Sequence, residues 1–196
     1  MLASRRVDVE HLNDLARERL RVDGVLGADE VVLGGRGYTT GDLVLALRND
    51  ARLGVLNGTR AVIDRIDTDH RYLDCRTETH QRLRLPFQYA ESGELTHGYA
   101  MTIHKAQGGT YDRCFVLAGD QLTRESAYTA LSRAREGTDV YVISDDPRAD
   151  DAHMPEHRDQ PIDVFRNTVR RSHAQQMAVD VQEHEPDDGA DIDIGM

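Results

Sequence analysis

The spacing of hydrophobic side chains along the chain changes twice. In residues 7–22, apolar positions recur at helical intervals, and Asp8 stands where it can cap the start of a helix. Short apolar runs follow, with turn residues such as Asn57-Gly58 between them. Each of these runs predicts a strand, over residues 30–33, 42–48, 60–66, 71–76 and 80–85. The first of them ends at the glycine-rich residues 34–37. Several short strands in succession favour a small β-barrel.

From Leu95 onward, strand and helix patterns alternate. Residues 96–100, 114–117 and 139–143 predict buried strands, whereas residues 102–107 and 123–135 predict helices. Alternating elements of this kind indicate a parallel sheet with helices on its faces. The predicted fold class is therefore α/β, a parallel sheet interrupted by a small β-rich unit.

Charge is distributed unevenly along the chain. The net charge of the 196 residues is −11, but residues 144–196 hold 14 Asp and Glu against 5 Arg, whereas residues 1–143 hold 21 acidic and 19 basic residues. We expect the acidic tail, residues 145–196, to be largely disordered apart from a helix over residues 163–178. The nearly neutral remainder neither requires nor excludes a nucleic-acid partner.

Other compositional features predict a cytoplasmic protein with no membrane partner. No apolar run is long enough to span a bilayer, and no apolar stretch follows the N-terminus as in a secretory signal. The two cysteines, Cys75 and Cys114, have no metal-type spacing and are interpreted as reduced thiols. No metal site is predicted.

One lysine stands out among the basic residues. Of the 24 basic residues 23 are arginine, and the single lysine, Lys105, lies in the segment His97–Thr110. Exposed N–H groups and a Thr hydroxyl between a strand end and a helix start suit contact with phosphate. Taken alone, His104 and Lys105 also fit a solvated loop, and the Ser132–Arg135 sequence also fits charges on the surface of a helix.

The order of these segments resembles the second RecA-like domain of superfamily 1 RecD-type helicases, and the helicase part of MobF or TraA-type conjugative relaxases. Gly98–Gly108 resembles helicase motif V, and Tyr128–Arg135 resembles motif VI. Leu2–Val9, followed by Leu12-Asn13 and Ala16-Arg17, is similar to motif IV. Segments from Gly41-Asp42 to Asn57-Gly58 look like the opening of an SH3-like insertion.

The resemblance implies a division of the chain and a set of site residues. Residues 1–37 and 96–144 would form the RecA-like domain, residues 38–95 the SH3-like insertion and residues 145–196 the tail. Arg133 would be the arginine finger that approaches the γ-phosphate of ATP, and Arg5 a second phosphate contact, with Arg6 as the alternative register. The residues expected to face the nucleotide are Gln107, Gly108 and Arg135. Those expected to face the backbone of single-stranded DNA are Thr102, His104 and Lys105.

The sequence lacks the phosphate-loop motif with which such motors bind ATP. A phosphate loop of the form Gly-x-x-x-x-Gly-Lys-[Ser/Thr] is impossible, because Lys105 is the only lysine and stands in no such pattern. ATP and Mg²⁺ would therefore be bound mainly by an N-terminal RecA-like domain that is missing here, and we expect no hydrolysis by this chain alone.

The partners implied are that missing domain, single-stranded DNA and, in a relaxase parent, a relaxase domain. The resemblance also implies 5′ to 3′ movement of the intact enzyme. The sequence does not distinguish a relaxase, a repair helicase or a stand-alone motor as the parent. Two other hypotheses remain open: a non-catalytic DNA-binding or protein-interaction module derived from a helicase, and a remnant without activity.

Overall fold

A parallel sheet and an antiparallel sheet make up the framework of the computed structural model, which describes residues 1–119, 121–142 and 160–170. The parallel sheet has the strand order β11-β10-β1-β9, and every neighbouring pair in it runs parallel. Its strands are β1 (Leu2–Ala3), β9 (Met101–Thr102), β10 (Tyr111–Ala118) and β11 (Ala134–Val142). This sheet confirms the predicted α/β class.

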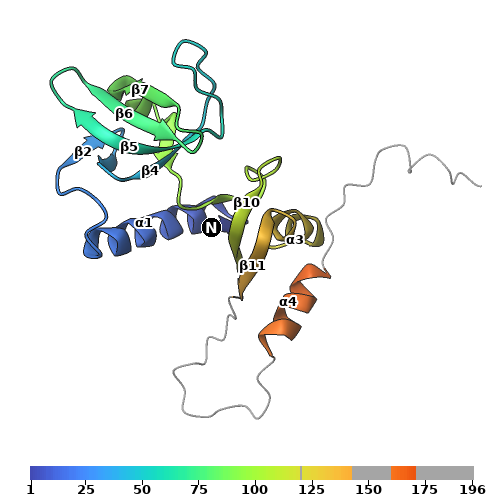
Figure 1. Cartoon of the computed structure of the whole chain (residues 1–196). Helices are drawn as coiled ribbons and strands as arrows, with labels where there is room; N and C mark the ends of the chain where they lie inside the picture. Colours follow the sequence, from blue (N-terminus) through green and yellow to red (C-terminus); the bar gives the residue numbers. More distant parts are fainter. Residues whose placement is uncertain (120, 143–159, 171–196) are drawn as a thin grey trace, which may run out of the picture.

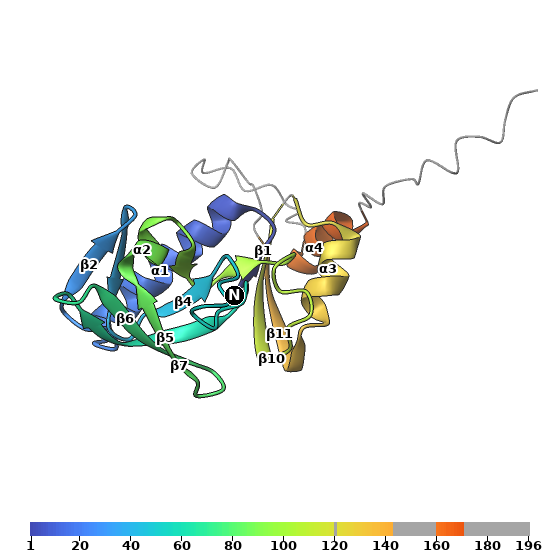
Figure 2. The same ribbon diagram turned by 90° about the horizontal axis from the view of Figure 1, so that it is seen from above.

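Helices lie on both faces of the parallel sheet, which is how such sheets bury their two apolar surfaces. The helix predicted over residues 7–22 is confirmed as α1 (Arg6–Val22), which contacts β1 and β9. On the other side of β10 and β11 lie α3 (Arg124–Leu131) and α4 (Pro161–Val169) (Figures 1 and 2). The helix predicted over residues 163–178 overlaps α4, but residues 171–178 lie outside the described residues.

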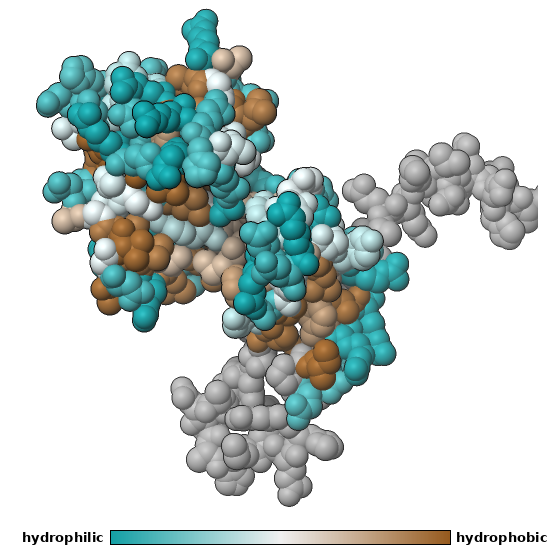
Figure 3. Space-filling view, in the orientation of Figure 1, coloured by the Kyte–Doolittle hydropathy of each residue, from teal (hydrophilic) through white to brown (hydrophobic). Residues whose placement is uncertain are grey.

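The five-stranded antiparallel sheet follows α1 in the chain. Its order is β7-β6-β5-β4-β8, with neighbouring strands antiparallel throughout. The strands are β4 (Leu43–Ala46), β5 (Arg60–Asp67), β6 (Tyr72–Thr77), β7 (Arg82–Pro86) and β8 (Leu95–His97), and a short helix, α2 (Phe87–Glu91), precedes β8. Four of these strands were predicted from the alternating pattern. Figure 3 shows hydrophilic side chains over much of the visible face of this lobe.

One prediction around this sheet is wrong, and one strand was not predicted. Residues 96–100 do not form one strand of the parallel sheet, because Thr96 pairs antiparallel with Leu45 and β8 completes the antiparallel sheet. Strand β2 (Glu30–Leu33) ends before the glycine-rich segment as expected, but β3 (Arg36–Thr39), which was not predicted, then returns antiparallel to β2. The turn between them uses Gly34 and Gly35, whose φ values of 57° and 79° favour glycine.

Strand β4 separates two hydrophobic cores, because successive side chains of a strand point to opposite faces. Val44 and Ala46 pack in the core of the antiparallel sheet, together with Leu33 and Tyr38 of the β2–β3 hairpin. Leu45 instead packs in the core between the parallel sheet and α3. Most of the hairpin (residues 30–39) lies before residue 38, so the core of the antiparallel sheet includes a residue, Leu33, from the RecA-like side of the expected domain boundary.

Among the described residues, no helix is long and apolar enough to cross a membrane.

Candidate nucleotide and nucleic-acid interface

The first candidate residues lie where β1 gives way to α1. Arg5 is the residue before the first turn of the helix, and its Nε and Nη2 donate hydrogen bonds to the two carboxylate oxygens of Asp8, each at 2.8 Å. Arg6 opens the helix and is exposed. Arg5 is therefore paired with its own helix although its side chain is 47% exposed, and Arg6 is a second exposed basic side chain at this end of the sheet.

The segment that resembles motif V follows β9 as a series of turns. The helix predicted over residues 102–107 is wrong: after the Ala106 N–H bonds to the Thr102 carbonyl at 3.1 Å, the next bonds span only three residues. The Thr102 hydroxyl accepts the Lys105 N–H at 3.2 Å, and Gly108 has a φ of 81°. A side-chain acceptor at the start and a left-handed residue at the end both compete with helical bonding.

These turns divide the motif into an inner and an outer set of side chains. Ile103 and Ala106 are buried in the core beside β10. The outer set, which is exposed, is His104, Lys105, Gln107 and Gly108. The turns therefore present to solvent four of the residues that were expected to meet DNA or nucleotide, whereas Thr102 is half-buried.

Lys105 lies in the electric field of Arg6. Partial burial and the Arg6 charge both lower the pKa of Lys105 below its usual value. Two cations brought together from α1 and the motif V turns repel one another, and an anion between them relieves that repulsion. The place where these two segments meet suits a phosphate group.

Arg133 connects the two motifs. It follows the last turn of α3, where its Nε donates to the Thr129 carbonyl at 3.0 Å and its Nη2 to the Ser132 hydroxyl at 2.9 Å. Its Nη1 donates to the carbonyl of Gly109 at 3.3 Å, at the end of the motif V turns. A guanidinium has five N–H groups, so two remain for another acceptor. Arg135 lies apart from this cluster, in an exposed pair with Asp112 at 3.1 Å.

The start of α3 also has a clear local cause. Thr123 and Ser126 exchange hydrogen bonds between their side chains and the other's backbone N–H, which makes a capping box. The helix then runs only to Leu131, and residues 134 and 135, predicted to be helical, belong to β11. The Arg133 carbonyl accepts the Tyr111 N–H at 2.9 Å, which directs the chain into the sheet.

The structure does not bring Arg5 and Arg133 together. Ala3 is paired with Leu117 near the carboxyl end of β10, whereas Arg133 bonds to Tyr111 at its amino end. Six residues of strand separate these levels, which is about 20 Å at the rise of a β-strand. The motif V turns cover this distance, from Thr102 at one end to Gly109 at the other.

The residues around motif V that sequence reasoning missed are buried and polar. Asn13 of α1 has an exposed fraction of 1%; its Oδ1 accepts the Ala100 N–H at 2.9 Å and its Nδ2 donates to the Ala100 carbonyl at 3.2 Å. This two-point contact fixes α1 against the residue that leads into β9. The available signal was an Asn and an Arg four residues apart on one helix face, Asn13 and Arg17, next to apolar positions.

Asp42 forms a second link between α1 and this region. Its carboxylate is fully buried and accepts Nε and Nη2 of Arg17 at 2.9 and 3.0 Å, the Thr39 N–H at 2.8 Å and the Tyr99 hydroxyl at 2.9 Å. Although burial opposes the charge, the hydrogen bonds to Asp42 and Glu30 raise the pKa of Arg17. Tyr99 is thus engaged with a buried carboxylate, and α1, the antiparallel sheet and motif V are joined by charge-assisted bonds.

Comparisons with known proteins agree with this arrangement. Residues 97–143 match the family model described as UvrD-like helicase C-terminal domain. The conjugal transfer protein TraA of Agrobacterium fabrum is 39% identical over 154 residues, and the probable TraA of Sinorhizobium fredii is 37% identical over 144 residues. Each alignment covers 72% of this chain and 13% of the relative, so the chain spans a small part of these proteins.

The solved structures show a related fold. Pif1 helicase from Bacteroides, in complex with ADP-AlF3 and single-stranded DNA, superimposes with a TM-score of 0.52 at 20% identity, covering 71% of this chain and 39% of that one. The helicase match covers motif V, α3 and β11, and the TraA similarity extends over 72% of the chain. Residues 97–143 therefore belong to the UvrD-like helicase C-terminal domains, within a chain that is similar to part of the TraA proteins.

Proposed function

We propose that the chain is the C-terminal motor half of an ATP-dependent 5′ to 3′ DNA helicase or translocase. In this proposal Arg133 is the arginine finger, and the antiparallel unit is the SH3-like insertion of the family. ATP and Mg²⁺ are bound mainly by a preceding RecA-like domain, because this sequence has no phosphate-loop lysine. The chain alone then turns over no ATP.

The observation that carries the proposal is the bond from Arg133 to Gly109. It places one guanidinium at the junction of the motif V turns and the end of α3, beside Gln107 and Gly108. The two N–H groups that have no acceptor among the described residues are available to an incoming γ-phosphate. A guanidinium in that position stabilises charge developing during phosphoryl transfer, an effect worth roughly 10³–10⁵ in rate.

The DNA track in this proposal runs along the exposed part of motif V. His104 and Lys105 are exposed, Thr102 is half-buried, and the charge of Arg6 acts on Lys105. Cations beside exposed backbone N–H groups suit a phosphodiester backbone. Single-stranded DNA is present in the Bacteroides Pif1 structure. The strand separation argues that neither Arg5 nor Arg6 shares one phosphate with Arg133 in this conformation. Arg6, whose charge acts on Lys105, is the better candidate for a basic contact to the DNA backbone.

The experiment uses a complete motor in which a RecA-like domain with a phosphate loop precedes this chain. Arg133→Ala is expected to lower kcat by about 10³ or more while nucleotide affinity changes little, because the missing contact forms in the transition state. The control is Arg124→Ala, an exposed arginine at the other end of α3, which should leave kcat near the parental value. Normal turnover in Arg133→Ala would remove the role proposed for this residue.

A second measurement separates the motor from a binding module. The chain alone should bind oligo(dT) in a salt-dependent way, and Lys105→Ala should weaken that binding while ATP turnover stays absent. Binding that is as tight after Lys105→Ala and Arg6→Ala as before would exclude the proposed track. It would favour a DNA-binding or interaction module built on another surface.

A further inference from the structure

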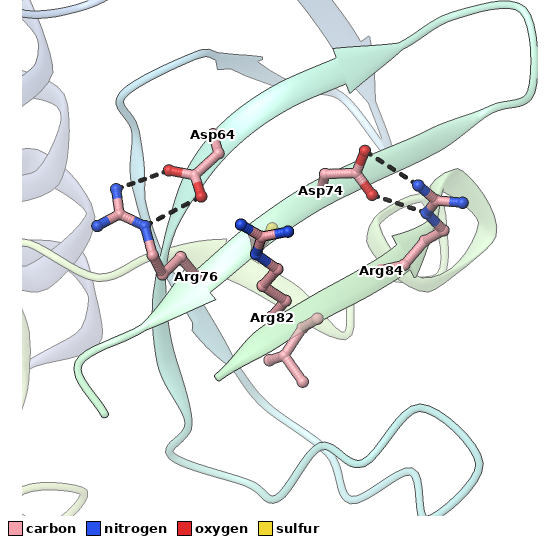
Figure 4. Close-up of a pocket in the computed structure, with 7 residues that line it drawn as sticks. Asp64, Asp74, Arg76, Arg82 and Arg84 are labelled. Carbon is pink, nitrogen blue, oxygen red and sulfur yellow. Dashed lines mark hydrogen bonds and ion pairs between the residues drawn. The ribbon is translucent and has the colours of Figure 1, made fainter. Parts of the chain in front are cut away.

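A charged hollow of about 430 Å³ lies on the outer face of the antiparallel sheet, away from the motif V turns. Its rim carries side chains from three adjacent strands, β5, β6 and β7, and Figure 4 shows the charged ones side by side. The charged residues of the rim are Asp64, Asp74, Arg76, Arg82 and Arg84. The buried residues Cys75 and Leu83 lie beneath it.

Four of these five charges are already paired. Arg76 reaches the two carboxylate oxygens of Asp64 at 3.1 and 2.9 Å, and Arg84 reaches those of Asp74 at 2.7 and 3.3 Å. The guanidinium of Arg82 lies between these two pairs (Figure 4). In the part of the chain that the structure describes, no hydrogen bond or ion pair joins the Arg82 side chain to an acceptor. One positive charge in the hollow is left over.

The pairing of β6 with β7 makes the unpaired charge of Arg82 destabilising. Arg82 stands directly opposite Arg76 on the neighbouring strand, and like charges in that relation destabilise a sheet. The carboxylate of Asp64 approaches Arg76 from the β5 side, so it does not separate the two guanidiniums. An anion placed over Arg82 would meet one free guanidinium and the unused N–H groups of two others.

The charge of the hollow decides what kind of anion fits. Three arginines and two aspartates leave a surplus of one positive charge, and the two carboxylates of the rim repel a densely charged phosphate backbone. A planar carboxylate needs only one fork of a guanidinium, which is the geometry Arg82 offers. The hollow therefore suits carboxylates spaced along a peptide better than it suits a nucleic acid.

The chain itself contains such a peptide. Residues 183–193 hold six carboxylates and no lysine or arginine. Residue 183 is 13 positions beyond Arg170, and an extended chain of that length reaches about 45 Å, more than the radius of a domain of this size. A tethered ligand acts at an effective concentration in the millimolar range, which allows a weak single-fork contact to be occupied.

We propose that the Arg82 hollow binds carboxylates of residues 183–193 of the same chain. The bond is an Arg–carboxylate fork with its remaining contacts to the outer N–H groups of Arg76 and Arg84. Because these groups are exposed, the contact is sensitive to salt. This interaction is independent of ATP and of the role proposed for Arg133.

The test is paramagnetic broadening in the full-length, ¹⁵N-labelled chain. A nitroxide is attached through Ile192→Cys, since the two native cysteines are buried. The amide signals of residues 74–76 and 82–84 should lose intensity relative to the reduced label. The loss should disappear in Arg82→Gln, in a chain whose acidic residues in 183–193 are changed to Asn and Gln, and at 1 M salt, where the Debye length is about 3 Å.

The control variant is Arg19→Gln, which removes an exposed arginine of α1 and should leave the broadening unchanged. Broadening that survives Arg82→Gln, or that falls on residues 103–107 instead, overturns the proposal. Oligo(dT) added to the chain with the neutralised tail provides the last arm. If it shifts the signals of residues 82–84, the hollow is a nucleic-acid site and the assignment to the tail is wrong.

Discussion

His97 shows at the scale of one residue how the antiparallel core restricts protonation. The ring has an exposed fraction of 1%, and its Nε2 donates to the Gly37 carbonyl at 3.0 Å. Nδ1 is buried without a hydrogen-bond partner, so a proton there would have no acceptor. Burial lowers the pKa of His97 to about 4, although Asp42 lies 3.9 Å from the ring and favours the charged form, while Arg17 and Arg36 oppose it.

This shift predicts a pH dependence of stability. In the unfolded chain a histidine titrates near 6.5, so between pH 6.5 and about 4 the unfolded state binds a proton that the folded state does not. The free energy of unfolding should therefore be fully retained above pH 6.5 and fall as the pH drops toward 4. Urea unfolding at several pH values should show a flatter profile for His97→Gln, and no change for His11→Gln. An unchanged slope in His97→Gln would contradict the assignment.

Two ion pairs share a similar forked geometry but differ in burial, so we expect their removal to change the free energy of unfolding by different amounts. Arg17 and Asp42 have side-chain exposed fractions of 12% and 0%, whereas Arg76 and Asp64 have 48% and 40%. Removing one partner of a buried pair leaves an uncompensated charge, so Asp42→Ala should lower the free energy of unfolding by roughly 3–5 kcal/mol. Asp64→Ala should change it far less, because water solvates the remaining arginine. Equal effects in urea unfolding would show that burial does not govern these pairs.

At the scale of elements, local patterns predicted some parts and long-range pairing decided others. The alternating sequences of β5 and β6 were recognisable because each has one buried face. The turns after β9 were mistaken for a helix, since the Thr102 hydroxyl and the left-handed Gly108 are weak local signals beside an apparent helical period. The pairing of Thr96 with Leu45 joins distant residues, and no local pattern contains it.

Motif-like segments named the candidate residues of the site, Arg133 among them, but gave no information on their layout. The distance between Arg5 and Arg133 depends on the strand order, which places β1 beside β10 with Ala3 opposite Leu117. Asn13, which bonds to the backbone of Ala100 before β9, lies in the segment similar to motif IV, but the sequence assigns it no role. Its partner is 87 residues away, so the contact is known only from the fold.

The hairpin of β2 and β3 offers a matched test of close packing. Both turn glycines have left-handed φ values, but a Cβ on Gly34 would lie 2.9 Å from the Ala90 carbonyl oxygen, whereas one on Gly35 meets nothing within 4 Å. Gly35→Ala should cost about 1–2 kcal/mol of backbone strain. Gly34→Ala should cost more, because the backbone of α2 must also move. Equal losses in urea unfolding would show that the hairpin does not press on α2.

At the scale of the whole molecule, strand β4 contributes side chains to the hydrophobic cores of both sheets. The side chain of Leu45, with an exposed fraction of 2%, packs with Met101, Cys114 and Val116 although its own strand belongs to the antiparallel sheet. Together with the bonds of Asp42, this makes the antiparallel unit part of the support of motif V. Displacement of the antiparallel unit should therefore alter the packing of the parallel sheet.

Leu45→Ala tests that coupling directly. Truncating this buried side chain should lower the free energy of unfolding by roughly 2–5 kcal/mol, because it opens a cavity between the two sheets. Hydrogen exchange should then accelerate in β10 as well as in β5, although the substitution lies in β4. Leu56→Ala, at a position 68% exposed in the loop after β4, should alter neither. If β10 kept its protection in Leu45→Ala, the two sheets would be independent units, and motion of the antiparallel unit could not reach Arg133 through their shared core.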